Sequence, residues 1–260
     1  MKKSIFFAVI LVLFSQITLQ ADRRYFARSY TSYTLPAGAL EMEIWNTGKF
    51  GKDDGYFYRW QPRVEFEYGI TDKFTTAIYF NFDETRSKNN SYPSKSFSFV
   101  ATSLELRYRL FEIGEYFIDP TLYGEIYFGG DKIKYEPKIF LTKRFQNFIG
   151  VMNLNSEIEK YVADQKTESK FEITGGVAYE MNSNFSVGME LRQHFNFSNI
   201  YEIKKNQAFF LGPTLNVQTK KFYFTINFLA QISGTPQGHK NLDLKGHEKF
   251  EVRTILGIEL

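Results

Sequence analysis

Apolar and polar residues alternate along most of this chain, in segments about ten residues long. In the segment 222–232, for example, one set of alternate residues is apolar: Phe222, Phe224, Ile226, Phe228, Ala230 and Ile232. A period of two indicates a β-strand with one apolar and one polar face. Strands of this length with such faces are typical of transmembrane β-barrels, in which alternate side chains meet lipid.

Turn residues divide the pattern into twelve expected strands. They span about 38–47, 56–68, 74–83, 97–110, 116–128, 132–142, 147–158, 170–180, 185–197, 207–217, 222–232 and 249–260. Every second connection is short, and the others are mostly longer and more polar. Bacterial outer-membrane barrels alternate short periplasmic turns with longer extracellular loops, and their even strand count leaves both termini in the periplasm. The sequence therefore predicts an all-β fold, a transmembrane antiparallel up-and-down β-barrel of about twelve strands.

The first residues have the features of a secretory signal peptide. Lys2 and Lys3 precede an apolar run at 5–14, and a small residue, Ala21, ends a plausible cleavage region. The run is too short to span a bilayer. We therefore expect a signal peptide at 1–21, a periplasmic N-terminal segment at 22–37 and the barrel at 38–260.

Two features fit the strand pattern poorly. Four prolines fall inside expected strands, where each removes a hydrogen-bond donor, so we expect them near strand ends or at bulges: Pro62, Pro120, Pro137 and Pro213. The stretch 148–152 is apolar on both faces of its strand.

Composition agrees with a barrel and excludes several other classes. Mean hydropathy is −0.33, which excludes a helical membrane protein. Aromatic residues make up 18% of the chain and cluster at the short turns, as in the girdles of barrel proteins. The net charge of +3 gives no basic excess for a nucleic-acid partner. Cysteine is absent, which excludes disulfides and a lipid-modified cysteine.

Charged residues in the strands fall on the inward register, because a charge facing lipid at mid-membrane costs several kcal/mol. This register carries thirteen acids and seven bases: Glu41, Glu43, Arg63, Glu65, Glu67, Glu105, Arg107, Arg109, Glu125, Lys134, Glu136, Lys138, Glu157, Glu172, Glu180, Glu190, Arg192, Glu251, Arg253 and Glu259. His194 shares it. The candidate lumen-lining residues are Glu41, Glu43, Arg63, Glu65, Glu67, Glu105, Arg107, Arg109, Glu125, Glu136, Glu172, Glu190, Arg192, His194, Glu251 and Arg253.

Two interpretations of these charges stay open. They could line a polar channel with an acidic bias that favours cations, or they could form a salt-bridge network that fills a narrow barrel. Arg63 is suited to pair with Glu65 and Glu67 across strands, as are Arg107 and Arg109 with Glu105. Eight strands give a filled interior and sixteen an open channel, so twelve strands do not decide between the two.

Residues suited to catalysis or metal binding are few. His194 is best explained as a polar residue of the barrel wall. His239 and His247 could share a metal with Asp243 and Glu248, but a solvated loop is the simpler expectation. We expect no catalytic residues, no metal and no cofactor.

Two short stretches resemble a family of uncharacterised, porin-like outer-membrane barrels of Gram-negative bacteria. Leu35-Pro36-Ala37-Gly38 followed by Glu41-Met42-Glu43-Ile44-Trp45 is similar to the first strand of that family, and the 67–74 stretch is similar to the turn that follows. The resemblance implies a barrel in the outer membrane and no known activity. Its partners would be the lipid bilayer, lipopolysaccharide and the outer-membrane assembly machinery, with an oligomeric state that the sequence leaves open.

The sequence thus favours a small porin-like channel for small polar solutes or cations. Two alternatives are a plugged structural or adhesion barrel that acts through its extracellular loops and, less favoured, a barrel enzyme that modifies lipids.

Overall fold

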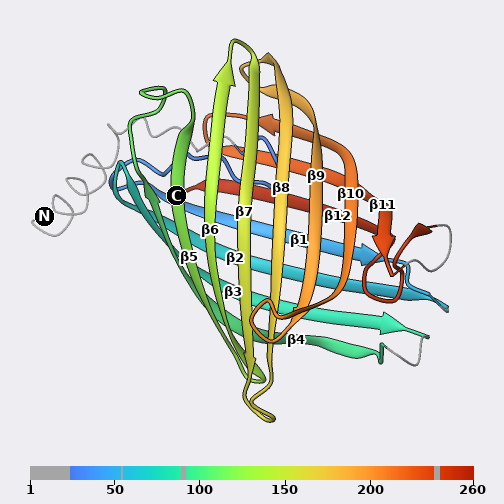
Figure 1. Cartoon of the computed structure of the whole chain (residues 1–260). Helices are drawn as coiled ribbons and strands as arrows, with labels where there is room; N and C mark the ends of the chain where they lie inside the picture. The colour runs from blue at the N-terminus through green and yellow to red at the C-terminus, as the bar shows by residue number, and fades with distance from the viewer. Residues whose placement is uncertain (1–23, 54, 89–91, 237–240) are drawn as a thin grey trace, which may run out of the picture.

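The computed structural model describes residues 24–53, 55–88, 92–236 and 241–260 as a single closed β-barrel (Figure 1). Its twelve strands are β1 (Leu40–Phe50), β2 (Phe57–Thr71), β3 (Phe74–Ser87), β4 (Lys95–Arg109), β5 (Asp119–Gly129), β6 (Lys132–Phe145), β7 (Phe148–Tyr161), β8 (Thr167–Asn182), β9 (Phe185–Ser198), β10 (Ile203–Gln218), β11 (Phe222–Thr235) and β12 (Phe250–Glu259). Each strand pairs antiparallel with its neighbours in sequence, and β1 pairs with β12 to close the barrel. The described residues contain no helix that is long and apolar enough to cross a membrane. The signal peptide expected at 1–21 lies outside the described residues.

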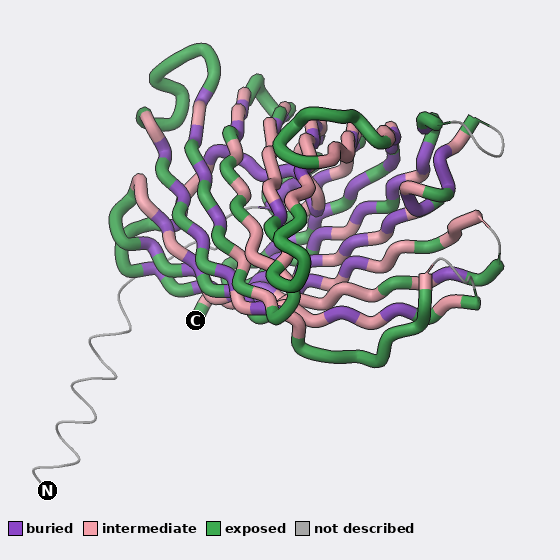
Figure 2. The backbone as a smooth tube through the Cα atoms, turned by 60° about the horizontal axis from the view of Figure 1, so that its bottom comes forward, coloured by how far each residue is buried: buried purple, intermediate pink, exposed green. Residues whose placement is uncertain are grey.

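Exposure alternates along the strands, as the period-two pattern predicts (Figure 2). On β4, Leu104 and Leu106 are each 47% exposed on the outer surface, whereas Glu105 between them is completely buried. Exposed aromatic residues lie beside the short turns, among them Tyr68, Phe145 and Phe148. An apolar outer surface with aromatic borders and a polar interior is the arrangement of a barrel that crosses a bilayer.

The connections sort into two ends of the barrel. The end at which β1 begins and β12 ends, here called the terminal end, has two-residue turns at 72–73, 146–147 and 183–184. The opposite end, here called the loop end, has longer connections such as 51–56 and 236–249. The turn expected at 111–115 is longer than predicted and spans 110–118, so β5 begins three residues late. At the loop end, the connection 130–131 is short, as the sequence indicated.

Several strands are longer than their apolar pattern. β8 runs from Thr167 to Asn182 rather than over 170–180. The extra residues are mostly polar, and they continue the hydrogen-bonded ladder beyond the apolar band. The alternation of hydropathy reveals only the part of a strand that faces lipid, so it underestimates the length of the hydrogen-bonded strand.

Only one of the four prolines lies near a strand end, whereas all four were expected near strand ends or at bulges. Pro120 lies at the start of β5, as expected. Pro62, Pro137 and Pro213 lie inside β2, β6 and β10, and paired residues are missing from one side of each strand at these positions. A missing donor is tolerated there because the second neighbouring strand still holds the proline's own strand in place.

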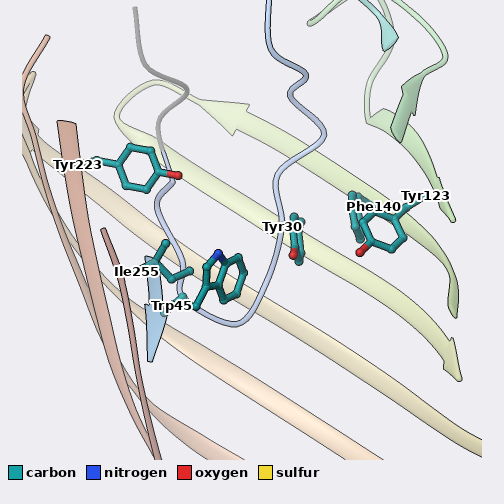
Figure 3. Close-up of a cluster of buried hydrophobic side chains, with 7 residues drawn as sticks. Tyr30, Trp45, Tyr123, Phe140, Tyr223 and Ile255 are labelled. Atoms are coloured by element: carbon teal, nitrogen blue, oxygen red, sulfur yellow. The ribbon is translucent and has the colours of Figure 1, made fainter. Parts of the chain in front are cut away.

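The N-terminal segment occupies the barrel interior, which corrects the expected periplasmic placement of 22–37. Residues 24–37, here called the lumenal segment, are largely buried, and Phe26 and Ala27 are completely so. Figure 3 shows this segment as a blue ribbon that turns back on itself beside inward aromatic side chains. Ala37 at its end donates a backbone hydrogen bond of 2.9 Å to Asp72 in a terminal-end turn. Near its other described end, Tyr25 donates a hydrogen bond of 2.7 Å to Glu180 close to the 183–184 turn, so both described ends of the segment lie toward the terminal end.

The lumenal segment explains the stretch that is apolar on both faces. Ile149 and Val151 of β7 point inward and pack with Tyr25, Phe26 and Ala178 in one buried cluster. Inward apolar residues would be out of place in a water-filled lumen. Here they bury apolar surface against the segment.

The two faces of β7 provide a test of the register. Leu154 at mid-strand faces lipid, whereas its neighbour Asn155 faces an internal cavity beside Glu157. Leu154→Arg should destabilise the barrel by about 2–4 kcal/mol, since it places a charge in the bilayer core. Asn155→Arg should cost less than about 1 kcal/mol. Urea titrations of folding into lipid vesicles measure both, and equal losses would contradict this register.

Candidate functional site

The structure directs all sixteen candidate lumen-lining residues into the barrel. Fourteen of them are buried, among them His194 at 8% exposed, and the other two, Arg63 and Glu136, line an internal cavity with several of these. They do not form one site. They divide between an open half with a large cavity near the loop end and a packed half near the terminal end.

The half near the loop end contains a cavity of about 620 Å³, here called the vestibule. Its wall carries eleven Lys and Arg side chains against seven Asp and Glu side chains. The acidic excess expected for the whole lumen is therefore absent from this part. A wall with an excess of positive charge raises the local concentration of anions.

Ion pairs across β5 to β8 hold many of these charges in place. Lys134 lies 2.8 Å from Glu136 and 3.2 Å from Glu157. Lys138 lies 2.9 Å from Glu136 and 3.6 Å from Glu125. Glu125 stands directly opposite Glu136 in the ladder, so Lys138 separates two like charges.

A second network forms part of the vestibule floor around Arg28 of the lumenal segment. The Arg28 guanidinium lies 2.7 Å from Glu172, and Arg192 lies 2.6 Å from the same carboxylate. Arg192 also contacts Glu251 at 3.1 Å and Glu248 at 2.7 Å. Three acids and two bases thus form one ion-pair network that connects the barrel wall to the lumenal segment. The fixed charges of the vestibule floor therefore come from both the wall and the segment.

Below the floor, the lumenal segment is hydrogen-bonded to the wall through its backbone. Glu190 accepts from the N–H groups of Ala27 at 3.2 Å, Arg28 at 2.9 Å and Ser29 at 2.8 Å. Tyr30 stacks on Phe140 with ring centroids 4.8 Å apart. These contacts satisfy donors that the turn of the segment would otherwise leave unpaired.

Two glycines make room for the segment. A Cβ at Gly176 would lie 2.5 Å from the Phe26 ring, and a Cβ at Gly69 would lie 2.0 Å from the Pro36 carbonyl oxygen. The cavity lined by Arg24, Glu41, Glu43 and other residues of this half measures only about 10 Å³. This volume holds about one water molecule. The terminal half is therefore packed around the segment.

Five of the candidate residues form an acidic cluster in this packed half: Glu41, Glu43, Glu65, Glu67 and Glu105. Arg107 lies 3.1 Å from Glu67 and 2.6 Å from Glu105. The sequence also suggested Arg63 as a partner of Glu65 and Glu67. Instead, the Arg63 guanidinium packs over the rings of Trp45 at 4.4 Å and Tyr79 at 4.7 Å.

The end of the last loop is buried, which corrects the expectation of a solvated loop. Asp243, His247 and Glu248 are 2%, 2% and 6% exposed. Burial lowers the pKa of His247 to about 2, so its imidazole is neutral at physiological pH. His247 bonds to Asn206 at 2.9 Å and packs edge-on against His194. His239 lies outside the described residues.

Within the described residues, His247 does not form a metal site with Asp243 and Glu248. Among the described residues, the three ligands found close enough to share one ion are Glu43, Glu65 and Glu67. His194 instead bonds to Glu172 at 2.8 Å and to Asn196 at 2.9 Å. These contacts place His194 in the polar wall, as the sequence analysis preferred.

The alternating pattern of the strands did not single out the residues of the lumenal segment, above all Arg24, Arg28 and Tyr30. One available signal was the doubly apolar stretch at 148–152, which shows that part of the lumen is dry. No signal of this kind pointed to the buried part of the last loop.

Comparisons with solved structures show the same fold in porins and channels. The COG4313 outer membrane channel from Pseudomonas putida F1 is 12% identical, with a TM-score of 0.68 over 88% of this chain and 98% of that chain. The NanC porin is 11% identical, with a TM-score of 0.57 over 84% of this chain and 100% of that chain. The KdgM porin is 8% identical, with a TM-score of 0.55 over 85% and 99%.

Comparison with curated protein sequences gives no match. One family model matches residues 18–116 and 112–260, which together cover the entire barrel and the lumenal segment. The chain therefore belongs to the family of unknown function DUF6662.

Proposed function

We propose that this protein is a porin-like channel for small polar solutes in the outer membrane of Gram-negative bacteria, held closed by its lumenal segment. The fold it shares with outer-membrane porins and channels supports this assignment. The terminal end would face the periplasm and the vestibule would open to the outside, as the loop lengths favour.

The observation that carries the proposal is that the segment closes the lumen without being part of the barrel. β1 begins at Leu40 and pairs with β12 and β2 over its whole length. The segment is attached to the wall by side-chain hydrogen bonds, ion pairs and apolar contacts. The sheet can therefore stay closed while the segment moves.

Charge is distributed in a way that favours solutes of low net charge. The vestibule carries an excess of bases, whereas the half behind it contains the acidic cluster. An anion is attracted by the vestibule and repelled by the acidic cluster behind it, whereas a cation is repelled by the vestibule and attracted by the acidic cluster. Small neutral or zwitterionic polar molecules would meet the lowest barrier.

A permanently closed barrel that acts through its loops is the second candidate. The tight packing of the terminal half favours it, since such packing also suits a structural plug. We propose no enzymatic activity, and association with lipopolysaccharide and the assembly machinery stays a prediction.

Gly176 offers a way to displace the segment. Gly176→Leu would place side-chain atoms where the Phe26 ring lies, while the strand itself stays paired. Overpacking of about 1–3 kcal/mol on the closed state should raise the open population roughly 5- to 150-fold. Single-channel recordings in planar bilayers measure the open fraction.

The matched control for that substitution is Gly124→Leu, because a Cβ at Gly124 has no atom within 4 Å. It should behave like the unmodified protein. If both variants fold and neither conducts, the structural barrel is the better description.

A reversible covalent link provides the opposite test. The Ser32 backbone N–H lies 2.7 Å from Oγ1 of Thr142 on β6, and the chain contains no native cysteine. A Ser32→Cys/Thr142→Cys variant should be closed when oxidised, because the disulfide ties the segment to the wall. Reduction should restore openings in the same bilayer. Equal conductance before and after reduction would exclude the segment as a gate.

A further inference from the structure

Two successive inward rungs of the β1–β2 ladder pair glutamate with glutamate. Glu41 stands opposite Glu67, and Glu43 stands opposite Glu65. Like charges directly opposite each other destabilise a sheet, and the effect grows when water is excluded. We propose that Glu43, Glu65 and Glu67 bind a divalent cation, with Ca²⁺ as the best fit, in the packed half of the lumen.

The nearby bases do not balance this acidic cluster. Arg107 serves Glu67 and Glu105, and Arg24 lies 3.1 Å from Glu43. Arg63 adds a third positive charge, which is stacked on aromatic rings. Five carboxylates thus face three guanidinium groups. A single divalent cation would neutralise the remainder.

Glu65 is the residue that points most directly to a ligand. Its side chain is completely buried, and neither carboxylate oxygen accepts a hydrogen bond from an N–H or hydroxyl donor among the described residues; its polar side-chain neighbour is the Glu67 carboxyl group. A buried charge is paired or coordinates a metal, since the cost of leaving it alone is high. Glu43, by comparison, already accepts hydrogen bonds from Arg24, Trp45 and Tyr223.

The geometry suits a hard cation. One ligand atom from each of Glu43, Glu65 and Glu67 lies within 4.8 Å of the others. Carboxylates at this separation can meet at one ion with Ca–O distances of about 2.3–2.6 Å. Each of the three carboxylates supplies one oxygen, and Glu65 can supply its second oxygen as well. Mg²⁺ usually keeps several waters, for which the adjoining cavity of about 10 Å³ has little room.

A proton bound to Glu65 is the competing explanation, because it also removes one negative charge. The two explanations differ in their response to metal. The inference rests on the packed half of the lumen and does not depend on whether the barrel conducts.

Terbium luminescence tests the site directly, because Tb³⁺ binds where Ca²⁺ does and is sensitised by a nearby tryptophan. Trp45 Nε1 lies 2.6 Å from a Glu43 oxygen. Protein refolded in detergent after removal of metals should show Tb³⁺ emission on tryptophan excitation. Added Ca²⁺ should suppress the emission, and metal analysis should find one Ca²⁺ per chain. Trp45→Phe should remove the emission but retain the Ca²⁺.

Glu65→Gln separates the metal from the proton. It should weaken Ca²⁺ binding at least tenfold, whereas Glu136→Gln, whose carboxylate already has two lysine partners, should bind like the unmodified protein. Heat-dependent gel mobility verifies that each variant is folded. Absence of bound Ca²⁺ and Tb³⁺ from the folded, unmodified protein would overturn the proposal, as would unchanged affinity in Glu65→Gln. Should Glu65→Gln not fold, the unmodified protein and Trp45→Phe still decide.

Discussion

The cost of placing a charge in lipid governs this structure. Because the outer surface must be apolar where it meets lipid, most charged strand residues are directed into one narrow interior. Charges that are crowded there and partly shielded from water need partners, and strands alone supply them unevenly. Most other features of the molecule provide partners for these charges.

The source of these partners differs between the two ends of the barrel. Near the loop end, lysines and glutamates of β5 to β8 pair with one another and keep contact with water in the vestibule. Near the terminal end, the wall has too few bases, and the chain supplies more from outside the strands. Arg24 and Arg28 are brought in by the lumenal segment, and both contact wall carboxylates. The segment thus pairs charges and fills space at the same time.

This double role has a consequence for gating. A segment held by ion pairs and backbone hydrogen bonds leaves behind hydrated carboxylates when it moves, and water can solvate these. A segment held only by apolar packing would leave a dry surface exposed to water. The contacts of Glu190 and Glu172 with the segment are of the first kind, whereas those of Phe26 with Ile149 and Val151 are of the second. The balance between them sets how readily the lumen opens.

The sequence by itself determined the barrel, its approximate strand number and the inward direction of the charged residues. These follow from a local period of two, which a single strand displays without reference to its neighbours. The partners of those residues depended on the tertiary structure. Glu65 and Arg63 lie two residues apart on one strand, yet Arg63 packs on Trp45 and Tyr79 of the adjacent strands, and Glu65 faces Glu43. The burial of the lumenal segment and of Asp243, His247 and Glu248 in the last loop was likewise decided only by the fold. Neither segment has a repeating pattern, and the surface each one covers is assembled from strands far apart in the chain.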